Sequence, residues 1–241
     1  MRFMIMHKTN ARWEAGEVPT PELVARVGAM LGGLARAGVL LAAEGLRASR
    51  EGVRLRFSKG VRTVVPGPFA GENELPAGFT ILRTASLDEA VEWATRVGAA
   101  LGDVEIDIRP VTEPWDIGVA PKPDPLETRR YMALRKATPA TEAGAEPTGA
   151  QRAAIAGLVS ESERAGRHLA TESLRPSARG RRYKHAQGGI SVIDGPFTES
   201  KELIAGYVIV SADSLDEAGR LAEEYIRTVG AHEVDVREVE G

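Results

Sequence analysis

The sequence contains no cysteine and few aromatic residues. The absence of cysteine excludes disulfide bonds and thiolate chemistry. Aromatic residues make up 5% of the chain, so its core must be mostly aliphatic. No stretch approaches the roughly 18 apolar residues of a membrane-spanning helix, and the apolar run at Arg2–Met6 is too short for a signal peptide. These absences predict a soluble, cytoplasmic protein.

The sequence also lacks any block of charge of one sign. Its 31 basic and 34 acidic residues are interspersed and give a formal net charge of −3. Neither a basic stripe nor a run of like charges is present, so we expect neither a nucleic-acid nor a membrane partner.

The chain is a tandem repeat of one module. Residues 1–113 align without a gap with residues 129–241, and more than a third of the aligned positions are identical. The repeat predicts two modules, 1–111 and 129–241, joined by a linker at 112–128. The linker contains four prolines, which predict an extended spacer.

Each module is predicted to contain, in order, a strand, a helix, several strands, a helix and a strand. In the first module, helices are predicted after Thr20 and Ser86, which suit helix N-caps. The predicted strands of that module are Arg2–Met6, Val39–Ala43, Val53–Phe57, Arg62–Val65, Gly78–Leu82 and Val104–Val111.

This order predicts an α+β fold of two ferredoxin-like (βαββαβ) modules, each with both helices on one face of an antiparallel sheet. The opposite face would expose aliphatic side chains and needs a cover. We expect the two sheets to face each other within one chain, as an intrachain pseudo-dimeric α+β barrel. The alternative is that each module pairs with its counterpart in a second chain, which would make a homodimer.

The most distinctive motif is the run from Asp194 to Glu202, Asp-Gly-Pro-Phe-Thr-Glu-Ser-Lys-Glu, followed by Ala205-Gly206-Tyr207. With the Leu-Asp-Glu-Ala helix start at Leu215 and the ending Glu233 to Arg237, it resembles the YCII-related family, in the branch named for its Asp-Gly-Pro-Phe turn. The resemblance covers both modules. The first module departs from the motif, because Pro66, Gly71 and Asn73 replace Asp194, Glu199 and Lys201.

The resemblance implies a dimeric α+β barrel whose activity is mostly undefined. Relatives include a dehydrochlorinase acting on a chlorinated ring, and some members are fused to sigma factors. A His-Asp pair is proposed as catalytic in the founding branch, and this sequence has no convincing counterpart of that pair.

The candidate catalytic residues lie in the second module. Asp194 either accepts backbone N–H groups in its own turn or acts as a general base. Lys201, with Glu199 and Glu202, either holds an acidic ligand or forms surface ion pairs. His185 is an acid–base candidate because its ordinary pKa is near neutral, and its alternative role is that of a surface strand residue.

Candidate ligand-binding residues are Arg175, Arg182 and Arg237, which the first module matches with arginines of its own, and Glu199. These arginines either line a pocket for an anion or pair with acids that are also matched between the modules. The four histidines lack metal-site spacing, and no cofactor is implied. Trp13 is a candidate core residue, or a lid over a cleft.

The sequence thus favours a small-molecule-binding protein with acid/base chemistry of the lyase or isomerase type on an anionic or aromatic metabolite. The competing hypothesis is a non-catalytic interaction or regulatory module. The two differ over the barrel interior, because an enzyme needs a concave cavity where at least two ionisable groups converge. A sealed interior filled by Val, Ile and Leu would favour the interaction module.

Overall fold

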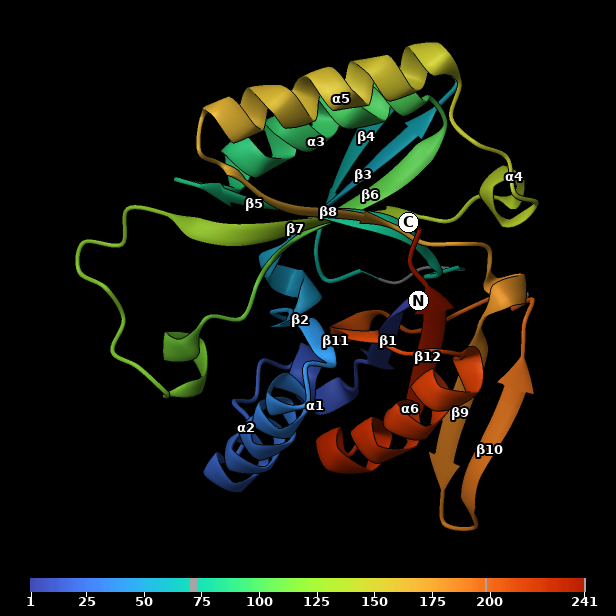
Figure 1. The fold of residues 1–241 in the computed structure, drawn as a ribbon. Coiled ribbons are helices and arrows are strands. Elements are labelled where there is room, and N and C mark those ends of the chain that lie inside the picture. Colours follow the sequence, from blue (N-terminus) through green and yellow to red (C-terminus); the bar gives the residue numbers. More distant parts are fainter. Residues whose placement is uncertain (70–72, 198, 241) are drawn as a thin grey trace.

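The computed structural model describes residues 1–69, 73–197 and 199–240, and consists of two six-stranded antiparallel sheets with long helices on their outer faces (Figure 1). The strands are β1 Arg2–Lys8, β2 Leu40–Gly45, β3 Val53–Ser58, β4 Val61–Pro66, β5 Pro76–Thr84, β6 Val104–Pro110, β7 Arg129–Lys136, β8 His168–Ser173, β9 Arg181–Ala186, β10 Gly189–Asp194, β11 Ile204–Ser211 and β12 Glu233–Glu238. The helices are α1 Ala11–Glu14, α2 Pro21–Arg36, α3 Leu87–Leu101, α4 Pro139–Glu142, α5 Gly149–Arg164 and α6 Leu215–Val229.

The two repeats exchange strands. One sheet has the order β10-β9-β12-β1-β11-β2 and the other the order β4-β3-β6-β7-β5-β8. In the first sheet, β12-β1-β11-β2 is the strand order of a ferredoxin-like unit, but β1 and β2 come from the first repeat while β11 and β12 come from the second. Each ferredoxin-like unit therefore combines the first half of one repeat with the second half of the other.

The helix-free faces of the two sheets pack against each other. Their shared core is largely aliphatic and draws on both sheets, with Met4, Met6 and Ile209 from one and Phe79, Met132 and Leu134 from the other. The outer face of each sheet has a separate core beneath its helices. The expectation that the bare faces cover each other within one chain is confirmed.

The long helices begin at the residues that the caps predict. The Thr20 hydroxyl accepts a hydrogen bond from the Leu23 amide at 3.3 Å at the start of α2, and the Ser86 hydroxyl accepts one from the Glu89 amide at 3.2 Å at the start of α3. Each contact satisfies one of the backbone donors that a helix leaves free in its first turn. Among the described residues, no helix is long and apolar enough to cross a membrane.

The linker is not extended throughout, which corrects the expectation from its proline content. Residues Pro114–Ile117 form a short 3-10 helix, capped by Glu113, whose backbone amide donates to Asp116 Oδ2 at 2.9 Å. Proline is tolerated at the first helical position because the amide that it lacks would have no partner there. The short helices α1 and α4 were also not predicted, since four residues are too few for a periodic pattern.

Candidate functional site

Asp194 lies at the exposed base of the β9–β10 hairpin. Its carboxylate accepts a hydrogen bond from Arg181 Nε at 2.8 Å, and Arg181 is directly opposite it in the strand register. In the first repeat the same pair of positions holds Pro66 and Val53, so both charges are replaced together. Asp194 and Arg181 thus form a cross-strand ion pair at the surface.

The remaining predicted catalytic residues are exposed and separate. His185 lies on β9 towards the hairpin tip, whereas Asp194 lies at its base. Lys201 approaches Glu199 at 3.4 Å with most of its side chain in water. Glu202 pairs with His232 on the surface. The structure does not bring these groups together around one cavity.

The predicted ligand-binding arginines make contacts within the protein. The guanidinium of Arg182 is buried, donates to Asp235 at 2.6 Å and stacks on the Phe197 ring at 4.5 Å. Arg237 is also buried and donates to the carbonyl of Arg175 at 3.1 Å. Arg175 itself is partly exposed on the surface.

The Gly-Pro-Phe turn brings the Phe197 ring into contact with the guanidinium of Arg182. The Phe197 amide donates to Ser177 Oγ at 2.9 Å, and this places the ring against Arg182. The first repeat builds the same turn, where the Phe69 amide donates to the Ser49 hydroxyl at 3.1 Å and the ring lies under Arg54 at 4.8 Å. The motif therefore has a structural role in both copies.

Replacing Gly195 by alanine should destabilise the protein by about 1–3 kcal/mol, the usual cost of forcing extra atoms into a packed site. The added Cβ would lie 1.8 Å from the Ser177 carbonyl oxygen, so the backbone must move. Urea unfolding monitored by circular dichroism measures the cost. Gly188→Ala is the matched control, because a Cβ there meets nothing within 4 Å; equal losses in the two variants would contradict the prediction.

Two buried ionic clusters join the repeats. In one, Lys8 of the first repeat contacts Asp235 of the second at 2.7 Å, and Asp235 also accepts from Arg182. In the twin cluster, Lys136 of the second repeat contacts Asp107 of the first at 3.1 Å. Burial alone would raise the pKa of Asp235, but the cations beside it outweigh burial and lower that pKa.

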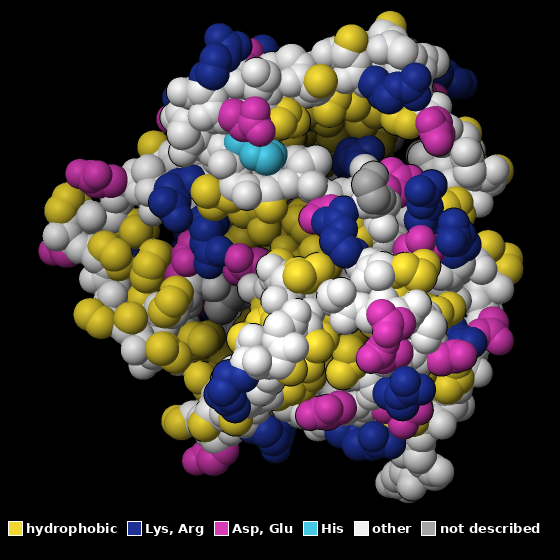
Figure 2. Space-filling view, in the orientation of Figure 1, with side chains coloured by type: hydrophobic (Ala, Val, Ile, Leu, Met, Phe, Trp, Pro, Cys, Tyr) yellow, Lys and Arg dark blue, Asp and Glu magenta, His cyan; other side chains and the backbone are white. Residues whose placement is uncertain are grey.

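A cleft of about 590 Å³ lies between α2, the sheet formed by β2, β11 and β1, and α6. Its wall is mostly apolar and includes Leu23, Val24, Val27 and Leu31 of α2 and Val208 of β11. Residues Pro114, Ile117 and Val119 of the linker close one side of it. Figure 2 shows apolar side chains gathered on the linker side of the molecule, beside a hollow.

Two ionisable side chains meet in the wall of this cleft. His7 Nδ1 lies 2.8 Å from the hydroxyl of Tyr225, which brings β1 of the first repeat to α6 of the second. Burial lowers the pKa of His7 to about 4 and raises the pKa of Tyr225. Both side chains are therefore neutral at physiological pH, and they can exchange hydrogen bonds with a ligand without introducing a charge.

A second polar group bounds the cleft on the linker side. Arg130 donates to Glu113 at 2.9 Å through two nitrogens and to Glu44 at 2.5 Å. Burial raises the pKa of Glu44, although Arg130 opposes that rise. Trp13 also lines the cleft and donates its indole N–H to the Leu46 carbonyl at 2.8 Å.

Reasoning from the sequence missed His7 and Tyr225. The signal that marks them is the repeat itself, because their twins are Arg135 and Val97. Two copy-specific polar residues in otherwise similar elements indicate a role that only one half of the molecule has. The cleft was missed because it combines both repeats with the linker.

The model of the YCII-related domain matches residues 1–113 and again residues 129–240. The chain belongs to the YCII-related family. No curated protein matches it.

The two YCII-related domains of this chain are twins in sequence but differ in what they contribute to the cleft. The first supplies β1, α2 and β2, and the second supplies β11 and α6. Within the described residues, no group of three or more His, Asp or Glu side chains has the arrangement of a metal site. The cleft offers apolar surface, the neutral His7–Tyr225 pair and, on the linker side, the ion pair of Arg130 with Glu44.

Proposed function

We propose that this YCII-related protein binds a small, largely apolar molecule in the cleft between α2 and the sheet. The ligand class is an aromatic or alicyclic compound that carries one hydroxyl, carbonyl or acid group. The observation that carries the proposal is the apolar cavity of about 590 Å³ with the His7–Tyr225 pair in its wall. Small-molecule sites usually combine apolar walls with a few converging polar groups.

The chemistry of the cleft favours a ligand with one polar end. Apolar side chains of α2 and of the linker would cover the body of the ligand, and burying that surface supplies most of the affinity. A neutral histidine leaves one ring nitrogen for the polar group of the ligand while the other contacts Tyr225.

We further propose that proton transfer in the cleft, of the lyase or isomerase type, would run through His7. An imidazole with a pKa of about 4 is unprotonated at neutral pH and can accept a proton. It is also a weak base, so binding is the primary proposal and catalysis is secondary. The ligand group that gives its proton to His7 must lie at the polar end of the ligand.

The competing hypothesis of an interaction or regulatory module expects no concave cavity with converging ionisable groups. The space between the two sheets is filled by mostly aliphatic side chains, and a filled interior favours that module. The cleft outside the sheet pair, with His7 and Tyr225 2.8 Å apart, favours ligand binding over that hypothesis.

The proposal predicts that Gly28→Phe abolishes ligand binding. Gly28 lines the cleft from the middle of α2, and a Cβ there meets nothing within 4 Å, so the phenyl ring would enter empty space. Replacing a mid-helix glycine should also leave the fold at least as stable. The measurement is a thermal-shift screen of phenols, cyclic ketones and aromatic acids against the original and variant chains.

The matched control is Gly33→Phe, because Gly33 lies on the same helix, has equally open space and does not line the cleft. We expect compounds that raise the melting temperature of the original chain to protect Gly33→Phe but not Gly28→Phe. Protection of Gly28→Phe to the same extent, or no protection by any compound, would exclude the cleft as the site.

A further inference from the structure

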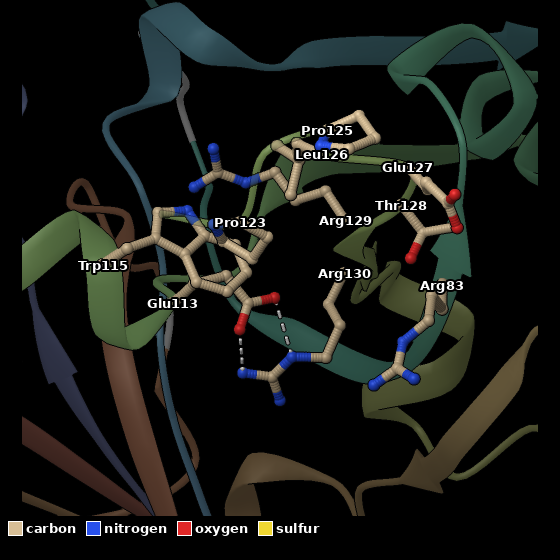
Figure 3. A pocket seen from close by; sticks show the side chains of 10 residues that line it. All are labelled: Arg83, Glu113, Trp115, Pro123, Pro125, Leu126, Glu127, Thr128, Arg129 and Arg130. Atoms are coloured by element: carbon tan, nitrogen blue, oxygen red, sulfur yellow. Dashed lines mark hydrogen bonds and ion pairs between the residues drawn. The ribbon is translucent and has the colours of Figure 1, made fainter. Parts of the chain in front are cut away.

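A second cavity lies outside the cleft, between the linker and strands β5 and β7, and has a volume of about 320 Å³ (Figure 3). Figure 3 shows Trp115 and Pro123 of the linker on one side of it and Arg83 on the other. The linker occurs once in the chain, so this cavity has no twin in the repeat.

Three arginines, Arg83, Arg129 and Arg130, and two glutamates, Glu113 and Glu127, line this linker cavity. Arg83 of β5 and Arg130 of β7 are directly opposite each other in the strand register. Like charges at such positions repel each other and are normally avoided. Carboxylates neutralise Arg130, whereas no described carboxylate lies within ion-pair distance of the exposed Arg83. The twin of Arg83 is Ser211, so the charge belongs to this half alone.

Two N–H donors beside the cavity are also without acceptors. The indole Nε1 of Trp115 and Nε of Arg129 are shielded from solvent, and neither has a hydrogen-bond partner among the described residues. Buried donors are normally paired, because an unpaired one costs free energy. The twin of Arg129 is Met1, which again confines the feature to one half.

The opposite wall of the cavity is apolar and flat. Trp115 and Pro123 lie together on the side away from Arg83, and Pro125 and Leu126 lie next to each other at another edge of the cavity (Figure 3). The cavity therefore offers the ring of Trp115 to an aromatic group and the guanidinium of Arg83 to an oxyanion. We propose that the linker cavity binds a small aromatic carboxylate, with its ring against Trp115 and Pro123 and its carboxylate at Arg83. This second site does not depend on the ligand proposed for the cleft.

The test uses isothermal titration calorimetry with 2-naphthoate on the full chain carrying Gly28→Phe, which blocks the cleft. We expect saturable binding of one equivalent. Arg83→Gln should weaken it about tenfold, because a charge-assisted hydrogen-bonded pair is lost. Trp115→Ala should weaken it similarly by removing the apolar wall. Arg167→Gln, a nearby charge removal outside the linker cavity, should leave the affinity unchanged.

Two further ligands separate the parts of the proposal. Naphthalene-2-carboxamide keeps the ring but has no charge, and inorganic phosphate keeps the charge but has no ring. Both should bind at least tenfold more weakly than 2-naphthoate. Absent binding of 2-naphthoate, unchanged affinity in Arg83→Gln or equal binding of phosphate would each overturn the proposal. Because the cleft is blocked throughout, these results do not bear on the proposed function.

Discussion

Replacing Asp235 by alanine should lower the free energy of unfolding by about 3–5 kcal/mol, the cost of breaking a buried ion pair from one side. Asp235 is fully buried and contacts Lys8 at 2.7 Å and Arg182 at 2.6 Å. Its removal leaves Lys8 without its carboxylate partner, while Arg182 keeps Glu233 at 3.2 Å. Urea unfolding monitored by tryptophan fluorescence measures the loss.

Asp194→Ala provides the matched control, because it removes a carboxylate at a similar distance from Arg181, the neighbour of Arg182 on β9, and the position of Asp194 is exposed. Exposed pairs of this kind contribute about 0–1 kcal/mol. A loss for Asp235→Ala as small as that of Asp194→Ala would show that the buried cluster does not stabilise the fold.

The buried clusters also bear on how the repeats are connected. Lys8 and Asp235 belong to different repeats, and so do Lys136 and Asp107. The loops that follow meet as well, since the Glu74 amide donates to the Ser200 carbonyl at 2.6 Å. Each exchanged unit therefore contains a buried charged contact that neither repeat makes by itself.

Most secondary structure was predictable because its signals are local. Capping residues such as Thr20 and Ser86 mark helix starts, and alternating side chains mark strands such as β6. The exchange of strands was not predictable in this way. Strands β1 and β7 are twins, so their sequences offer the same pattern to the partners in either repeat.

The candidate site was harder to predict for two physical reasons. The motif that identifies the family, from Asp194 to Phe197, performs its role through a turn that supports a buried arginine. The cleft, in contrast, has no contiguous motif, because His7 and Tyr225 are more than two hundred residues apart in the chain. In the sequence, the cleft is indicated only by a residue-by-residue comparison of the two repeats, in which His7 and Tyr225 differ from their counterparts.

Lowering the pH from about 7 to 4 should destabilise the protein by up to about 3 kcal/mol through His7 alone. The pKa of His7 is about 4 in the folded protein, against an ordinary value of 6.5 in an unfolded chain, and burial is the cause. Between these values the unfolded chain binds a proton that the folded protein does not, so stability falls as the pH falls from 6.5 towards 4. Below 4 both states are protonated and the histidine contributes no further change.

His7→Gln isolates this contribution, because glutamine keeps a hydrogen-bonding group for Tyr225 and does not titrate. Carboxylates that titrate over the same range do so in both chains, so the difference between the two stability profiles belongs to His7. We expect the variant to lose about 2–3 kcal/mol less than the original chain between pH 7 and pH 4 in urea unfolding. Parallel profiles would mean that the His7 ring is hydrated in the cleft, and would remove the apolar, neutral character on which the choice of ligand class rests.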